Sequence, residues 1–411
     1  KQGQTLEEVK DLLLNEIKKL RAGEFDEKML QANINNFKLY ELQSMESNEG
    51  RADIFVNSFI NGTNWEDEVT AIDRMAKLTK EDIVAFADKY LKEDNYAVVY
   101  KKQGKDPNEK KMTKPEITPI VSNRDVASPF LTSIQENAVK PIEPVFLDFK
   151  KDMSQLTAKS DIPVLYKQNT TNDLFQLIYV FDMGNNNDKA LGTAFDYLEY
   201  LGTSDMTPEE LKSEFYRLAC TFYVSPGNER TYVVLSGLNE NMPAAMQLFE
   251  KLLADAQVNK EAYDNLVGDI LKARADAKLN QGQNFSRLMN YAMYGPKSPA
   301  TNLLTEAELA SMNPQELVDR IHNQNNYKHR ILYYGPSSSK DLLATIDQYH
   351  QVPATLKDIP AGNEFSYLET PATNVLVAPY EAKQIYMAQI SNLDKKYDPA
   401  IEPTRESVSY T

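Results

Sequence analysis

Three side chains that could do chemistry lie close together in residues 195–203, which read Phe-Asp-Tyr-Leu-Glu-Tyr-Leu-Gly-Thr. The spacing predicts a helix, so Asp196, Glu199 and Tyr200 should project from one face of it. Carboxylates alone suit hard cations such as calcium or magnesium, whereas a neutral tyrosine is a poor zinc ligand. The other interpretation, which we favour, is an ordinary polar face above a buried stripe formed by Leu191, Ala194, Phe195, Leu198 and Leu201.

One cysteine and three histidines are the remaining candidates. Cys220 is the single cysteine, so an internal disulfide is impossible, and a catalytic thiol would need a histidine partner. His322, His329 and His350 form no motif with it, and the first two lack a metal-type spacing. We therefore expect a buried, unreactive cysteine in a helix, and surface histidines at 322 and 329.

Composition limits the class of protein. The chain has 411 residues, 42% of them hydrophobic and 26% charged, so it should form two or three globular domains. A formal net charge of −15 argues against nucleic acid and anionic lipid, because both are bound through basic faces. No apolar run approaches the roughly 20 residues that span a bilayer. The first residue is Lys1, and we expect the chain to be a piece of a longer protein.

Helices and strands are predicted from periodicity and capping residues. Thr5 and Glu8 form a capping box before an apolar helical repeat, and Thr79 and Thr207 are further N-caps. Helices are expected at 6–21, 26–46, 54–60, 67–75, 79–91, 189–200, 208–220, 242–256, 260–279 and 314–323. Strands are expected at 96–100, 145–149, 163–167, 174–183, 222–224, 231–238 and 330–334. Strands and helices without strict alternation indicate an α+β fold.

The chain also resembles itself. Residues 23–30 match 256–263 at an offset of 233, and residues 78–84 match 312–318 at an offset of 234. The segment 95–100 matches 326–334 after a small gap, and 365–390 echoes 145–181. Residues 105–142 are rich in proline and polar residues and read as a linker. We divide the chain into the back of one unit (1–104), the linker (105–142), a complete unit (143–352), and a linker with the start of a further unit (353–411).

Duplicated α+β units joined by polar connectors resemble the pitrilysin/insulinase family of inverted-zinc metallopeptidases. The resemblance covers nearly the whole chain. It implies that each unit is a mostly antiparallel sheet packed with several helices, the metallopeptidase LuxS/MPP-like fold. It also places residues 1–104 at the end of the family's catalytic half.

In that family the catalytic unit carries H-x-x-E-H on the helix after the first hairpin, and a further acidic ligand later in the chain. Asp196 and Tyr200 stand where the histidines should be, Glu199 keeps the position of the general base, and Asp269 falls near the later ligand. Two imidazoles at i and i+4 would bind zinc at about 2.0–2.1 Å, and the glutamate would take a proton from metal-bound water. Without them we expect a degenerate unit with no catalytic residue and no metal.

The resemblance implies that this chain is the non-catalytic portion of a zinc-dependent metalloendopeptidase, which shapes the peptide-binding chamber and closes over substrate. Zinc is expected in the parent. Arg405 and Tyr410 are candidate substrate contacts, after an arginine and tyrosine pair in the family's non-catalytic half. Expected partners are the remaining domains of its own chain and the parent's peptide substrates, with a homodimer left open and no nucleic acid or membrane. Relatives lead us to expect an exported or periplasmic location.

Two alternatives remain. The first is an inactive pitrilysin-like scaffold or assembly protein, distinguished by the absence of H-x-x-E-H anywhere in the parent. The second is a helical-repeat binding protein, against which the strand-rich residues 174–183 argue.

Overall fold

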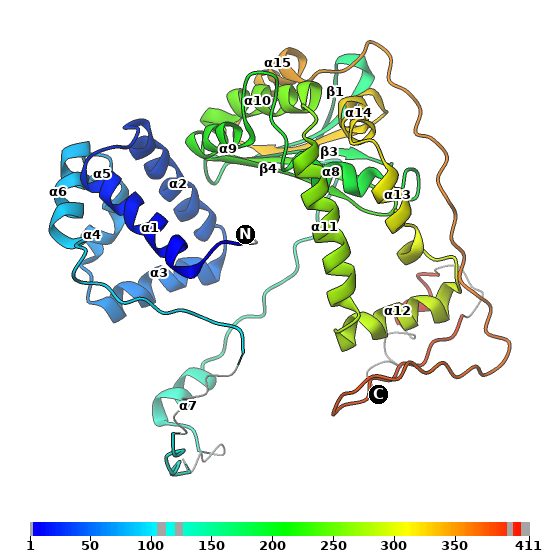
Figure 1. Cartoon of the computed structure of the whole chain (residues 1–411), viewed down its shortest axis with the longest axis horizontal. Coiled ribbons are helices and arrows are strands. Elements are labelled where there is room, and N and C mark those ends of the chain that lie inside the picture. Colours follow the sequence, from blue (N-terminus) through cyan, green and yellow to red (C-terminus); the bar gives the residue numbers. More distant parts are fainter. Residues whose placement is uncertain (1–2, 105–111, 120–125, 393–397, 404–411) are drawn as a thin grey trace. The chain divides into compact units, whose positions relative to one another are not determined.

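The computed structural model describes residues 3–104, 112–119, 126–392 and 398–403 (Figure 1). Two compact units emerge from the contacts within it: Lys1–Asp26 with Leu78–Asp152, and Glu27–Lys77 with Met153–Thr411. The contacts thus place residues 27–77 in a different unit from residues 1–26 and 78–104. The division predicted from the sequence keeps all of 1–104 together, and it stays a prediction. Within the described residues, no helix is both long enough and apolar enough to cross a membrane.

The larger unit is built on a six-stranded sheet in the order β1-β2-β6-β3-β5-β4. Strands β2 and β6 run parallel, and the other neighbours pair antiparallel. The mostly antiparallel α+β fold predicted from the sequence is therefore confirmed. The strands are β1 (Ser154–Ala158), β2 (Ile162–Gln168), β3 (Leu174–Phe181), β4 (Cys220–Pro226), β5 (Thr231–Leu238) and β6 (Arg330–Gly335).

The central strand β3 is apolar along nearly its whole length because both of its faces are covered. Phe175, Leu177 and Tyr179 join the main core, while Leu174 packs in a second cluster with Leu39. Helices surround the sheet (Figure 1), among them α10, which contacts β4, β5, α14 and α15. The helices that follow β3 are α8 (Leu191–Leu198), α9 (Pro208–Arg217), α10 (Met242–Asp255), α11 (Lys260–Ala277), α12 (Gln281–Tyr294), α13 (Glu306–Ser311), α14 (Gln315–Asn323) and α15 (Ser339–Tyr349). Of these, α12 lies at the far end of α11, away from the sheet (Figure 1).

The helices before residue 91 repeat the order of α10 to α14. They are α1 (Leu6–Arg21), α2 (Lys28–Ser44), α3 (Asn48–Asn61), α4 (Trp65–Val69), α5 (Ala71–Met75) and α6 (Lys80–Tyr90). Helix α1 contacts α6 as α10 contacts α14, and α2 contacts α5 as α11 contacts α13. Gly62 and Gly295 end the matching helices α3 and α12, both with positive φ, where an L side chain would be strained. The internal repeat predicted from the sequence is thus present in the helices.

The two copies differ in what their helices cover. Helix α1 buries none of its residues, and Leu12 and Leu13 are 56% and 64% exposed. Their counterparts on α10, Ala245 and Met246, are fully buried. Within the smaller unit, the contact between α1 and α6 includes a 2.7 Å bond from the Arg21 guanidinium to Asp88.

Two strand predictions are wrong. Residues 96–100 and 145–149 form no ladder with any described strand, and Val99 and Val145 are more than 90% exposed. Residues 365–390, which echo 145–181, form none either. The apolar pattern alone is insufficient, because a strand needs a neighbour to pair its backbone groups. Residues 96–100 correspond to β6, which has β2 and β3 on either side. The predicted linker also contains a helix, α7 (Pro129–Gln135), capped by Ser128.

Candidate functional site

The degenerate zinc-site positions lie at the end of α8. Asp196 is in its last turn, Glu199 is its C-cap residue, and Tyr200 follows with 44% of its surface exposed. The helix closes tightly here, because the Tyr200 and Leu201 amides donate to carbonyls three residues earlier. The helical face that should carry all three side chains therefore stops before Glu199.

The helix junction beside these positions is fixed by tyrosines. The predicted buried stripe of α8 is confirmed, with every member at most 3% exposed. Tyr197 is fully buried, donates a 2.6 Å bond to the Asn259 carbonyl and accepts a 2.8 Å bond from the Asn259 amide. Tyr263, edge-on to it, donates to the Leu309 carbonyl at 2.6 Å. Helices α8 and α11 are thus held together by aromatic side chains.

The acidic residues here do not form a metal site. Asp269 is exposed on α11, and among described residues no three or more His, Cys, Asp or Glu side chains gather closely enough to hold a metal. Partial shielding from solvent, together with the charge of Glu199, raises the pKa of the Asp196 carboxyl. The donors therefore do not fit zinc, which prefers imidazole or thiolate ligands. Arg405 and Tyr410 lie outside the described residues.

Cys220 is buried, as expected, but in a different element. It begins β4 instead of lying in a helix, and it is 1% exposed. Burial raises the pKa of its thiol to about 12, so the nucleophilic thiolate is disfavoured near neutral pH.

The prediction of surface histidines is wrong for His329. It is 7% exposed, and His350 is fully buried beside it with their Nε2 atoms 2.8 Å apart. His350 Nδ1 lies 2.7 Å from Oε1 of Glu250, which is also fully buried, and His329 Nδ1 lies 2.7 Å from the Tyr327 carbonyl. A chain of hydrogen bonds thus runs from α10 to the backbone before β6.

The number of protons in this hydrogen-bonded group of Glu250, His350 and His329 makes the group electrically neutral. Each of its three bonds needs one proton, and His329 Nδ1 must donate because a carbonyl only accepts. Three protons are the number carried by one carboxylic acid and two neutral imidazoles. Any placement of them leaves the group without net charge, which allows it to be buried.

Further donors surround the carboxyl group of Glu250. Tyr179 donates to Oε1 at 2.9 Å, while the Asn325 side chain and the Gln351 amide donate to Oε2, each at 3.0 Å. Burial, followed by the proximity of Glu250, raises the pKa of Tyr179 well above its usual value. Burial and the neighbouring His350 lower the pKa of His329 to about 4. The histidines and the glutamate come from distant parts of the chain, so no short motif reveals them.

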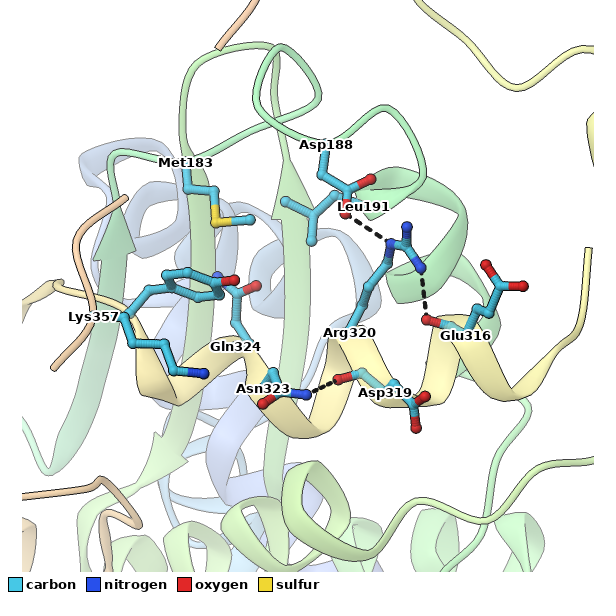
Figure 2. Close-up of a pocket in the computed structure, with 10 residues that line it drawn as sticks. Met183, Asp188, Leu191, Glu316, Asp319, Arg320, Asn323, Gln324 and Lys357 are labelled. Atoms are coloured by element: carbon cyan, nitrogen blue, oxygen red, sulfur yellow. Dashed lines mark hydrogen bonds and ion pairs between the residues drawn. The ribbon is translucent and has the colours of Figure 1, made fainter. Parts of the chain in front are cut away.

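A cavity of about 340 Å³ opens elsewhere in the same unit (Figure 2). One wall is formed by α14 and the residues that follow it, and the other by the end of β3 and the start of α8. Arg320 Nε donates to Asp188 Oδ2 at 2.7 Å across the two walls. The residues that line the cavity are Met183, Asp188, Leu191, Glu316, Asp319, Arg320, Asn323, Gln324, Tyr327 and Lys357.

No protein-family model and no curated protein matches the sequence. Solved structures do match. The periplasmic protease PqqL from Escherichia coli is 15% identical, and the match covers 91% of this chain and 42% of PqqL with a TM-score of 0.48. A peptidase M16 inactive domain from Pseudomonas fluorescens is also 15% identical, with 53% of each chain covered and a TM-score of 0.43. A mutant ferredoxin protease FusC in complex with Arabidopsis ferredoxin is 10% identical, with coverage of 86% and 42% and a TM-score of 0.46.

These structures are described as two proteases and a peptidase M16 inactive domain, which is consistent with the resemblance to the pitrilysin/insulinase (M16) family. At 10–15% identity the likeness concerns the fold alone. The chain spans 42–53% of the length of these structures.

Proposed function

We propose that this chain is a non-catalytic portion of a zinc-dependent metalloendopeptidase of the pitrilysin/insulinase type. In it, the chain would shape the peptide-binding chamber and close over substrate. The observation that carries this proposal is the end of α8, where Asp196, Glu199 and Tyr200 replace the H-x-x-E-H motif and supply no pair of imidazoles. Two carboxylates and a tyrosine, without the two imidazoles that hold a catalytic zinc, lack the ligands that this reaction class uses.

The packing around α8 supports a structural role. Tyr197 and its contacts fix the position of α8 against α11 through side chains that are buried and hydrogen-bonded. The side chains at the motif positions Asp196, Glu199 and Tyr200 are exposed beside this packed junction, and none of them is an imidazole that could bind zinc.

The wider assignment rests on the resemblance and on the internal repeat. We propose that the partners are the remaining domains of the parent and its peptide or protein substrates, and that zinc is held by the parent's catalytic unit. We propose a periplasmic or other exported location. Residues 143–352 would be one complete degenerate unit, with 1–104 belonging to the preceding one.

Metal analysis and peptide cleavage on the purified chain and on the full-length parent test this proposal. The chain should be free of zinc and inert, while the parent should carry one zinc per active unit and lose activity with a chelator. Stoichiometric zinc or chelator-sensitive cleavage in the chain alone would overturn the assignment. A zinc-free, inert parent would favour the inactive scaffold instead.

A further inference from the structure

The cavity beside α14 has a lining set by helical periodicity. Glu316, Arg320, Gln324 and Tyr327 recur every three or four residues, so they share one face of α14 and the turn after it. Across from them, Met183 and two residues around the start of α8 close the opposite wall (Figure 2). The cavity, about 340 Å³, falls in the range of roughly 300–1,000 Å³ typical of small-ligand sites.

Direct bonds hold the walls in place. The side chains of Arg320 and Asp188 are 29% and 25% exposed, and their 2.7 Å ion pair joins the two walls. The segment that carries Lys357 is tied down by its backbone, since the Lys357 amide donates to the Asn326 carbonyl at 2.7 Å and its carbonyl accepts from the Lys328 amide at 2.9 Å. The frame is therefore organised before any ligand arrives, which reduces the entropy lost on binding.

Gln324 is the unusual member of the lining. Its side chain is 1% exposed, yet neither its amide oxygen nor its amide nitrogen has a hydrogen-bond partner among the described residues. Leaving a buried amide unpaired is unfavourable, because its water partners are lost and nothing replaces them. Figure 2 shows the side chain rising from the end of α14 between Lys357 and Arg320. Because no bond within the described residues engages the amide, both its oxygen and its nitrogen remain available to a ligand in the cavity.

Charges of opposite sign flank this amide. Figure 2 places Lys357 at one end of the lining and Glu316 at the other. Over the described part of the chain, neither side chain is in an ion pair or a side-chain hydrogen bond. Between them, Arg320 is neutralised by Asp188. Along the lining, the cavity thus offers first the cation of Lys357, then the unpaired amide of Gln324, and then the anion of Glu316 (Figure 2).

We propose that this cavity binds short zwitterionic peptides of two or three residues. The α-ammonium group of the peptide lies against Glu316, its peptide bond pairs with the amide of Gln324, and its carboxylate faces Lys357. An amide pairs well with a peptide bond because each offers one donor and one acceptor. Small apolar side chains of the ligand fit against Met183 and Leu191, both of which are buried. This inference stands apart from the proposed function, since it involves no cleavage.

Calorimetric titration of the full chain with trialanine tests the proposal, with N-acetyl-trialanine amide as the uncharged comparison. Trialanine should bind, and the capped peptide should bind at least about tenfold more weakly, because both end-charge contacts are lost. Gln324→Leu should weaken trialanine binding by roughly tenfold or more. This variant removes an unpaired amide and keeps the side-chain volume, so the fold should be retained and its melting temperature should not fall.

Lys357→Gln should weaken binding by about fivefold, as expected for a partly exposed charge contact. Lys340→Gln, which makes the same change of charge at an exposed position of α15, should leave binding unchanged. The proposal is overturned if trialanine does not bind at millimolar concentration, or if the capped peptide binds equally well. Unchanged affinity in a folded Gln324→Leu chain would also overturn it.

Discussion

Replacing Glu250 with leucine should loosen the core of the larger unit. The substitution keeps the approximate side-chain size but removes both carboxyl oxygens. Four groups hydrogen-bond to the carboxyl group: Tyr179, His350, the Asn325 side chain and the Gln351 amide. Leucine offers none of them a partner, and the N–H groups of Asn325 and Gln351, which can only donate, are left unpaired.

The magnitude follows from the burial. Glu250 and His350 are both fully buried, so the unserved donors cannot turn to water. Two buried unpaired donors at about 1–3 kcal/mol each, or a buried pair broken at one partner at about 3–5 kcal/mol, give a similar loss. We therefore expect the free energy needed to open this region to fall by about 3–5 kcal/mol.

Hydrogen exchange followed by mass spectrometry measures that cost where it arises. Peptides from β3, β6 and α10 should exchange about 10²–10⁴-fold faster in the Glu250→Leu chain than in the unaltered chain. Glu209→Leu makes the same chemical change at an exposed position of α9 and should shift exchange little. Equal protection of the core in both variants would refute the network as a source of stability.

Further predictions concern pH, the cysteine and the lost metal site. The pKa of His329 is lowered to about 4 in the folded chain. As pH falls, the unfolded chain therefore binds the extra proton before the folded chain does. The free energy of unfolding should decrease between about pH 6.5 and pH 4, by up to roughly 3 kcal/mol. His329→Gln should flatten this dependence of melting temperature on pH, whereas His322→Gln should not; an equal slope in all three chains would contradict the assignment. Cys220 should resist iodoacetamide at pH 8 until urea is added, and rapid labelling of the folded chain would show that it is accessible. The double substitution Asp196→His with Tyr200→His should not create a tight zinc site, because Tyr200 lies past the end of α8; equimolar zinc after dialysis would show otherwise.

Local chemistry made much of the fold predictable. The capping boxes at Thr5 and Thr207 mark helix starts that the structure shares, because their bonds join residues three apart. The apolar run of β3 and the β4–β5 hairpin were equally legible. The burial of Cys220 is predicted correctly, but the helix expected around it is wrong, since a short apolar stretch can belong to either a helix or a strand.

Long-range features could not be read in this way. Residues 96–100 carry a strand pattern, yet strand formation depends on partners that no local pattern reports. In the network of histidines and glutamate, His329 and His350 are 21 positions apart in the sequence, and Glu250 and His350 are 100 positions apart. One signal was available: Glu250 follows Met246 by four residues on the apolar face of α10, and a charged residue at a core position requires partners. The cavity beside α14 likewise depends on how α8 and α14 pack.

The non-catalytic nature of this unit is tested most directly by Glu199→Gln in the full-length parent, with peptide cleavage measured as kcat/KM. Glu199 stands at the position of the general base, so a working site here would lose at least about 10²-fold in kcat/KM. The account predicts kcat/KM within twofold of the unaltered parent. A loss of two or more orders of magnitude, with the parent still folded and loaded with zinc, would contradict it.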